Sequence, residues 1–167
     1  DAKSATQDIG TGTRTLIAMV AAEELGLEMN QVTAHLGDTN FPPGRASGGS
    51  TTAASTSPAV KAAARKAKIQ LFEKIAPALG VPADQLSTAG GKVIASTGQS
   101  WAWQEATAQL GSQPVVVVSE FEEGFSGNNV AGVHFAEVEV DVETGRIQPI
   151  KIVAVNDCGL VVNNLLA

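Results

Sequence analysis

The chain has 167 residues, of which 11 are Lys or Arg and 17 are Asp or Glu, so its formal net charge is −6. At roughly 150 residues per domain, this length predicts a single domain over residues 1–167. The excess of acidic residues argues against binding to nucleic acid or to a membrane surface, because such binding needs a positively charged surface. The lone Cys158 excludes an internal disulfide and a Cys-rich zinc or iron–sulfur site. A membrane-spanning helix needs about 18 consecutive apolar residues, and no stretch of the sequence comes near that length.

The first half of the chain predicts two helices separated by a strand and a loop. Residues 13–27 place apolar side chains at helical spacing in an Ala-rich run. Residues 32–36 alternate apolar and polar side chains, which is typical of a short strand, and a long loop with Pro and Gly follows. A second Ala-rich helix is expected over residues 52–79, with an adjustment at Pro58.

The second half of the chain predicts mostly strands. Residues 92–95 and 115–119 are apolar and β-rich, and the second run is expected to be buried on both faces. Residues 136–142 alternate apolar and acidic side chains, and a turn at 143–146 leads into 147–155, which predicts a hairpin. This order of elements predicts an α+β fold in which two main helices pack on a mixed sheet in two layers.

A glycine-containing segment, Gln7-Asp8-Ile9-Gly10-Thr11-Gly12, lies directly before the first predicted helix. Glycines permit a sharp turn there, and the free amide N–H groups at a helix start attract an anion such as phosphate. A third Gly and a following Lys-Ser or Lys-Thr pair are absent, which excludes a complete dinucleotide fingerprint and a P-loop. Ordinary turn chemistry at a helix entry is the alternative interpretation.

A second segment rich in hydroxyls and glycines, Ser47-Gly48-Gly49-Ser50-Thr51-Thr52, lies at the start of the long predicted helix. Hydroxyls and bare amides can surround a phosphate or a polar heterocycle, whereas the alternative is an N-cap preceded by a flexible loop. Two helix starts of this kind in one small domain favour a large polar ligand that carries more than one phosphate.

The histidines and the cysteine predict structural roles. No second His or Cys lies at ligand spacing from His35 or His134, so we interpret both as hydrogen-bonded structural residues. Cys158 follows a predicted strand, where it could be reactive, but we expect it to be a small buried apolar side chain.

Three further groups of side chains also have a structural interpretation. Trp101 and Trp103 are expected to pack in the core, and no catalysis is assigned to Glu120, Glu122 and Glu123, which lack a partnering base or nucleophile. The basic residues of the long helix predict a solvated face, with docking of an acidic partner as the alternative. They are Lys61, Arg65, Lys66, Lys68 and Lys74.

Four stretches of the chain, read together, carry a family resemblance. They are residues 7–13, the Gly37-Asp38-Thr39 turn with Pro42-Pro43, residues 47–55, and the run 135–145 that continues to Asp157-Cys158-Gly159 and Asn163-Asn164. In this order and spacing they resemble the molybdenum-binding subunit of the xanthine dehydrogenase and aldehyde oxidase family, in particular its bacterial aldehyde-oxidising branch. The resemblance covers nearly the whole chain.

The resemblance implies a molybdopterin cofactor with molybdenum, in bacteria often as the cytosine dinucleotide, and the insertion of a water-derived oxygen into a C–H bond of an aldehyde or heterocycle. It implies that Gly10, Thr11 and Gly12 lie against the cofactor. Many family members carry Gln where this chain has Thr11, so the contact of that amide with the metal centre is not carried over. A second set of residues is implied to contact the phosphate and pterin: Ser47, Gly48, Gly49, Ser50, Thr51 and Thr52.

The catalytic base of this family is a Glu in a Gly-Val-Gly-Glu-like motif, which does not occur in these 167 residues. We therefore assign the chain no catalytic residue and no metal ligand, and we expect it to be an inactive segment of a longer chain. The resemblance implies partner subunits that carry 2Fe-2S clusters and FAD, and it leaves the bacterial compartment, cytoplasm or periplasm, open. Two rival hypotheses are a phosphate- or nucleotide-binding module of unrelated function and a non-enzymatic interaction domain.

Overall fold

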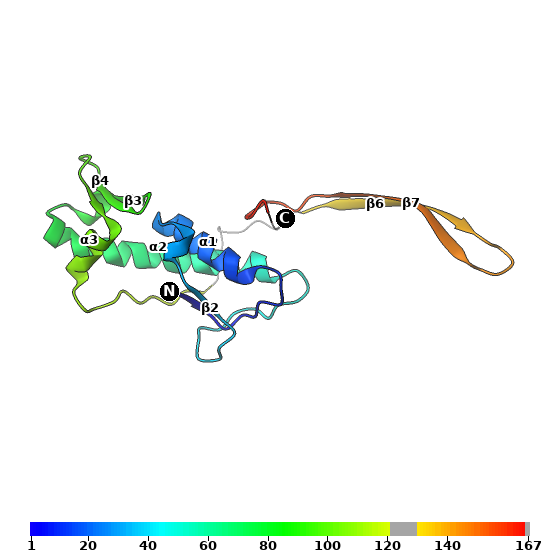
Figure 1. Cartoon of the computed structure of the whole chain (residues 1–167), viewed down its shortest axis with the longest axis horizontal. Helices are drawn as coiled ribbons and strands as arrows, with labels where there is room; N and C mark the ends of the chain where they lie inside the picture. The colour runs from blue at the N-terminus through cyan, green and yellow to red at the C-terminus, as the bar shows by residue number, and fades with distance from the viewer. Residues whose placement is uncertain (121–129, 166–167) are drawn as a thin grey trace. The chain divides into compact units, whose positions relative to one another are not determined.

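A computed structural model describes residues 1–120 and 130–165 of the chain (Figure 1). The chain divides into two compact units, Asp1–Ser126 and Gly127–Ala167. Within the described residues, unit 1 contains three α-helices and two small sheets, and unit 2 contains a two-stranded sheet. No described helix is long and apolar enough to cross a membrane.

The first helix, α1 (Thr13–Leu25), ends two residues earlier than expected. Gly26 follows in the left-handed conformation, with φ 66°, and its N–H donates to the carbonyls of Ala22 and Glu23. A Cβ at Gly26 would lie 2.7 Å from the backbone of Thr88, so this position requires glycine for both its conformation and its close contact. The helix end is therefore set by a tertiary contact as well as by a turn.

Two short strands form a parallel sheet beside α1. β1 (Ala2–Ser4) pairs with β2 (Ala34–Leu36), in the register Ala2 to Ala34. A short 3-10 helix, η1 (Met29–Gln31), leads into β2. The predicted strand 32–36 is confirmed over its last three residues, whereas β1 was not predicted, because three residues are too few to show a period-2 pattern.

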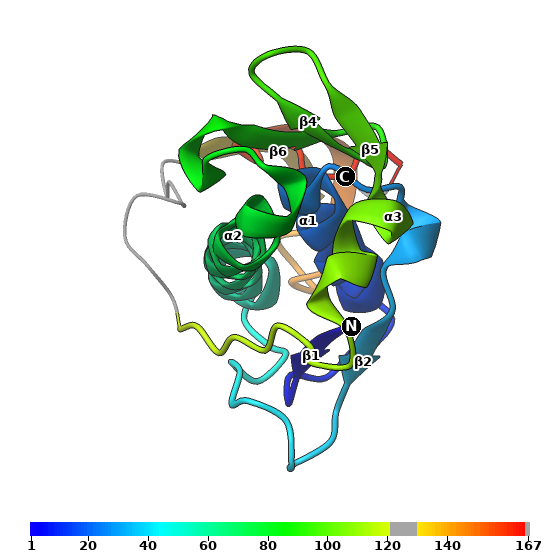
Figure 2. The same ribbon diagram turned by 90° about the vertical axis from the view of Figure 1, so that its left-hand side faces the viewer.

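The second helix, α2 (Thr52–Leu79), has the predicted bounds and packs along α1, as Figure 2 shows with α2 seen nearly end-on. The helix continues through Pro58, which is buried. Between the two helices, Lys68 Nζ lies 2.7 Å from Glu24 Oε1 and also donates to the Glu24 carbonyl. Ile17 and Ala18 of α1 form a small apolar cluster with Ala34.

The larger apolar core lies at the carboxyl end of α2. There an antiparallel sheet packs on the helix, and it consists of β3 (Leu86–Ala89), β4 (Lys92–Ala95) and β5 (Ser100–Ala102). In the chain, the 3-10 helix η2 (Ala83–Gln85) precedes this sheet. The helix α3 (Trp103–Thr107) and the 3-10 helix η3 (Ala108–Leu110) follow it. β4 confirms the predicted strand at 92–95, and Trp101 and Trp103 pack against the core as expected. The buried residues of this larger core are Leu71, Phe72, Ile75, Ala76, Leu86, Val93, Ala95 and Ala106.

The predicted strand at residues 115–119 is wrong. This segment forms no strand and pairs with none in the described part of the chain. Val116 and Val118 are exposed by 76% and 67%, while Val115 packs against the core of unit 1. An apolar β-branched run becomes a strand only where a neighbouring backbone offers hydrogen bonds, and the local pattern does not contain that information.

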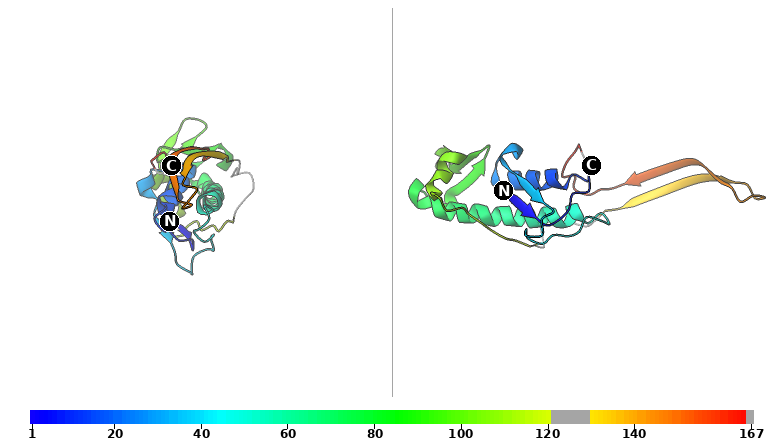
Figure 3. Two further views of the ribbon diagram at one scale, coloured as in Figure 1. Left: turned by 90° about the vertical axis from the view of Figure 1, so that its right-hand side faces the viewer. Right: turned by 60° about the horizontal axis from the view of Figure 1, so that its bottom comes forward.

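Unit 2 contains the predicted hairpin, formed by β6 (Gly132–Val140) and β7 (Ile147–Asn156), whose strands run side by side in Figure 3. Its first strand begins and ends earlier than the predicted range 136–142. A bulge lies at Glu137/Val138. At the turn, Asp141 Oδ1 accepts hydrogen bonds from the amides of Thr144 and Glu143. The Thr144 amide contributes most to lowering the pKa of this carboxyl, and the Thr144 side chain and the Glu143 amide act in the same direction. Gly145 has a φ of 72°, which favours glycine.

The α+β class is confirmed. Parallel and antiparallel pairing both occur in the described residues, but they are distributed over three small sheets instead of being combined in one mixed sheet. The two main helices, α1 and α2, pack on each other, and the sheets of unit 1 lie around them.

Candidate functional site

The glycine loop before α1 is organised around the carboxylate of Asp8. Asp8 Oδ1 accepts a hydrogen bond from the Gly10 amide and Oδ2 accepts one from the Arg14 amide, each at 3.0 Å. Gly10 and Gly12 have φ values of 94° and 78°, so both glycines are needed for the turn. Asp8 therefore holds the loop that carries Gly10, Thr11 and Gly12 against the first turn of α1.

The same contacts affect the ionisation of Asp8. The Arg14 amide contributes most to lowering the pKa of this carboxyl, and the amides of Gly10, Gly12 and Thr13 act in the same direction, while burial opposes them. Asp8 is therefore the anion at the start of α1, and some of the amides expected to be free there already have a partner in the chain. The sequence signal was an acidic residue just before a glycine loop and a helix.

The second loop satisfies some of its donors within the chain, since the Thr51 amide donates to the Gly48 carbonyl at 3.3 Å, and it leaves others open. Gly49 and Ser50 both have positive φ, at 58° and 57°, and a Cβ built on Gly48 or Gly49 meets no atom within 4 Å. The hydroxyl of Thr51 donates back to the Gly48 carbonyl at 2.9 Å, and no side chain in the described part caps the first turn of α2. This geometry does not support an N-cap role for the loop, and it presents backbone amides and hydroxyls to the surroundings.

The structure brings the two loops together. The Ser47 amide donates to Gln7 Oε1 at 3.0 Å, and the Ser47 hydroxyl donates to the Gln7 carbonyl. Just upstream, the hydroxyl of the fully buried Thr6 donates to the carbonyl of Arg45. Segments 40 residues apart in sequence thus form one surface in which the Gly10–Gly12 and Ser47–Thr52 loops are anchored to adjacent residues.

Other residues considered from the sequence lie outside this surface. His35 Nε2 lies 3.1 Å from Asp1 Oδ1, and His134 Nε2 lies 3.0 Å from Asn156 Oδ1, so both histidines have hydrogen-bonding partners, as expected. The expectation that Cys158 is buried is wrong, because its side chain is exposed. Among residues 1–120 and 130–165, no three His, Cys, Asp or Glu side chains are grouped so that they could hold a metal ion.

The basic residues of α2 form a mostly exposed face. Lys61, Arg65, Lys66 and Lys74 are exposed, as predicted, whereas Lys68 is partly buried in its ion pair with Glu24. The side chain of Lys66 also donates to Ser119 Oγ at 3.1 Å. Of the three acidic residues considered, Glu120 is exposed, and Glu122 and Glu123 lie outside the described residues.

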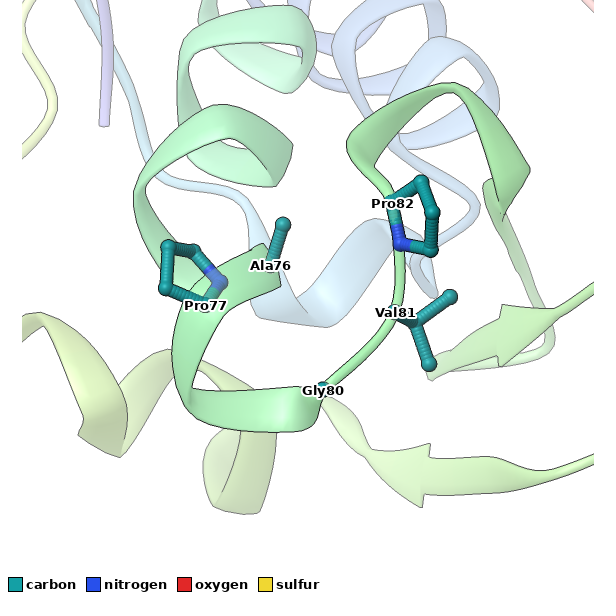
Figure 4. A pocket seen from close by; sticks show the side chains of 5 residues that line it. All are labelled: Ala76, Pro77, Gly80, Val81 and Pro82. Atoms are coloured by element: carbon teal, nitrogen blue, oxygen red, sulfur yellow. The ribbon is translucent and has the colours of Figure 1, made fainter.

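Two hollows of unit 1 do not coincide with these loops. One, of about 330 Å³, is an apolar depression at the end of α2, lined by the residues labelled in Figure 4. Another, of about 390 Å³, lies between α1 and the segment that leads into β2. Neither hollow is lined by Gly10–Gly12 or Ser47–Thr52, and the first contains no converging polar groups. The candidate site is therefore an open surface of donors.

Comparisons with known proteins identify the family of the chain. A family model described as molybdopterin cofactor-binding domain matches residues 2–167. The aldehyde oxidoreductase molybdenum-binding subunit PaoC of Escherichia coli K12 is 37% identical over 158 residues, which are 93% of this chain and 21% of that protein. A nicotinate dehydrogenase subunit of Pseudomonas putida KT2440 is 42% identical over 102 residues, which are 59% of this chain and 8% of that protein.

Solved structures share the fold. The Cu,Mo-CO dehydrogenase in its carbon monoxide reduced state superposes with a TM-score of 0.74 at 22% identity, over 96% of this chain and 21% of that one. Quinoline 2-oxidoreductase from Pseudomonas putida 86 superposes with a TM-score of 0.68 at 21% identity, over 96% of this chain and 22% of that one. The chain thus spans about a fifth of the length of the first relatives that it matches. The chain belongs to the molybdopterin cofactor-binding domain family of the molybdenum hydroxylases.

Proposed function

We propose that the chain forms part of the molybdopterin site of a longer molybdenum hydroxylase, which oxidises an aldehyde or an N-heterocycle with water as the source of oxygen. The observation that carries this proposal is the pair of hydrogen bonds between Gln7 and Ser47, which joins two donor-bearing loops into one surface. The names of the similar proteins, an aldehyde oxidoreductase subunit and a nicotinate dehydrogenase subunit, support these two substrate classes.

The donors of the second loop fit the anionic part of such a cofactor. The positive φ values of Gly49 and Ser50 and the uncapped first turn of α2 leave amides and hydroxyls that can hold phosphate oxygens without a basic side chain. We assign this role to the second loop, from Ser47 to Thr52. When bound, the molybdenum cofactor supplies the redox chemistry and accepts the electrons of substrate oxidation.

The first loop has a different share of the site. Because Asp8 already occupies amides at the start of α1, we assign Gly10, Thr11 and Gly12 to the uncharged part of the cofactor. The hydroxyl of Thr11 lies 3.3 Å from the hydroxyl of Thr13, so it is directed to its own loop and provides no Gln-like amide. The loop therefore shapes the site through its backbone.

The remaining parts of the proposal concern the whole enzyme. We propose that both units belong to one cofactor-binding domain over residues 1–167, that the cofactor is the cytosine dinucleotide form, and that partner subunits with 2Fe-2S clusters and FAD take up the electrons. The catalytic Glu would lie outside these residues, so the chain by itself is expected to be inactive. The names of the relatives as subunits support an assembly of several chains.

The first test measures the molybdenum content of the full-length protein, purified with its partner subunits, and identifies the nucleotide released by acid. We expect about one molybdenum per chain and a cytosine nucleotide. Correctly folded protein that holds a nucleotide but no molybdenum would instead support an unrelated nucleotide-binding module, and protein that holds neither would support an interaction domain.

The site assignment is tested by Gly49→Val in the same protein. A β-branched side chain at a φ of 58° strains the loop and projects among its donors, so molybdenum loading should fall at least tenfold. Gly90→Val is the matched control, because Gly90 has a φ of 56° and equally open surroundings but lies in the turn between β3 and β4. Equal loading of the two variants would remove Ser47–Thr52 from the site.

A further inference from the structure

Gln7 lies where the two loops meet, and it contacts Ser47 twice. Its side-chain oxygen Oε1 accepts a hydrogen bond from the Ser47 amide at 3.0 Å, and its backbone carbonyl accepts one from the Ser47 hydroxyl. Gln7 is exposed and Ser47 is half-buried. One exposed residue therefore fixes both the backbone and the side chain of the first residue of the second loop.

The chain just before Ser47 is held independently of Gln7. The Ala5 amide donates to the Pro42 carbonyl at 2.8 Å, and the buried Thr6 hydroxyl bonds to the Arg45 carbonyl. Gly44 packs so closely that a Cβ there would lie 2.6 Å from Ser4 Oγ. Loss of the Gln7 contacts should therefore leave residues 42–45 in place and affect the chain from Ser47 onward.

The chain after Ser47 has no equivalent support. Gly48 and Gly49 face open space, and in the described part of the chain the next hydrogen bonds are those of Thr51 to the Gly48 carbonyl, within the loop itself. Among the described residues, the hydrogen bonds of Gln7 are therefore the last ones that connect this loop to the rest of unit 1 before α2 begins at Thr52. On the other side, the neighbour Asp8 fixes the glycine loop.

We propose that Gln7 is a positioning residue for the cofactor: its side-chain oxygen holds Ser47 so that the open donors of the second loop face the ligand in one arrangement together with the first loop. This inference rests on the proposed function. An exposed hydrogen bond adds little to the stability of a fold, whereas ordering a loop before binding removes an entropic cost of binding. Gln7 should therefore affect cofactor retention far more than thermal stability.

The test compares three variants of the full-length protein, purified with its partner subunits. Gln7→Met keeps the length of the side chain and removes the acceptor, while Gln7→Glu keeps an acceptor oxygen. Gln31→Met is the matched control, because Gln31 Oε1 also accepts an exposed backbone hydrogen bond, from Glu28 at 2.9 Å, but lies in η1. Molybdenum and nucleotide per chain are measured after dialysis, together with Tm and the hydrogen exchange of residues 44–50.

We expect Gln7→Met to retain about tenfold less molybdenum and nucleotide than wild type, with faster exchange at Ser47 and a Tm close to that of Gln31→Met. Gln7→Glu, which keeps the acceptor oxygen, should return the exchange at Ser47 to the wild-type rate. Wild-type retention in Gln7→Met, or equally fast exchange at Ser47 in Gln7→Met and Gln7→Glu, would overturn the positioning role. A Gln7→Met protein that unfolds would also overturn it, because the fold would then depend on this contact. Absence of cofactor from wild type would instead overturn the proposed function.

Discussion

Asp8 shows how a single carboxylate can organise a loop and a helix start together. Its two oxygens accept hydrogen bonds from the amide of Gly10, in the loop, and from the amide of Arg14, in the first turn of α1. A negative charge at this place interacts favourably with the helix dipole and satisfies donors that have no partner within the helix. Asp8 therefore serves the function of a capping residue, although Gly12 occupies the N-cap position.

We predict that Asp8→Ala lowers the free energy of unfolding of the chain by about 1 kcal/mol at pH 7, as for loss of a helix cap. The pKa of Asp8 is lowered in the folded state below its ordinary value of 3.8. The stabilisation is therefore complete above pH 3.8 and is lost as the pH falls through the lower folded-state pKa. Urea denaturation at several pH values measures this difference.

Asp38→Ala is the control for this prediction. Asp38 also accepts a backbone hydrogen bond, from Asn40 at 2.8 Å, but it lies in a turn and not at a helix start. Its replacement should change the free energy of unfolding by at most about 0.5 kcal/mol. If the difference in the free energy of unfolding between wild type and Asp8→Ala stayed constant down to the lowest pH, the charge of Asp8 would not be the cause of the stabilisation.

The candidate site could be predicted from the sequence only in part. The glycine and hydroxyl segments themselves were visible as patterns of residue types that suit a phosphate, but their contact was not, because Gln7 and Ser47 are 40 positions apart. The role of Asp8 was missed for a different reason. A helix start was expected to offer free amides, and a side chain six residues before Arg14 reaches one of them.

Among the elements, α2 connects the two apolar clusters of unit 1. Its carboxyl half carries Leu71, Phe72 and Ile75 in the larger core, and Val60 in its amino half packs against the cluster around Ile17. A helix of 28 residues can do this because the apolar positions recur along its length, which is also why its bounds could be predicted.

We predict that Ile75→Ala destabilises the chain by about 3 kcal/mol, because Ile75 is 0% exposed and its loss leaves a cavity in the larger core. Ile69→Ala, in the same helix at 49% exposure, should change the free energy of unfolding by less than about 0.5 kcal/mol. Chemical denaturation of both variants measures the two effects. Similar values would contradict the placement of the core on this face of α2.

We also predict that Lys68→Met destabilises the contact between α1 and α2 by about 1 to 2 kcal/mol, because Glu24, 16% exposed, loses its charged partner. Lys74→Met, at an exposed position of α2, is the control and should have little effect. Thermal unfolding of the two variants tests this, and an equal Tm for both would show that the ion pair contributes nothing measurable.

At the scale of the whole molecule, the α+β class followed from the order of helical and strand patterns, but the pairing of the strands did not. Residues 92–95 and 115–119 have similar apolar character, yet the first segment is β4, which is paired on both sides, and the second forms no strand. β1 and β2 pair in parallel although they are separated by the whole of α1. Such pairings depend on which backbones meet in space.

By itself, the sequence determined the elements with strong local signals: the bounds of α2, the hairpin of β6 and β7, and the two donor-bearing segments before α1 and α2. These follow from periodicity, turn chemistry and residue type, which act over a few neighbouring residues. Only the tertiary structure decided that Gln7 and Asp8 hold both segments, that Cys158 is exposed and that residues 115–119 form no strand. Hydrogen bonds and burial between distant residues depend on the packed arrangement, which local patterns do not contain.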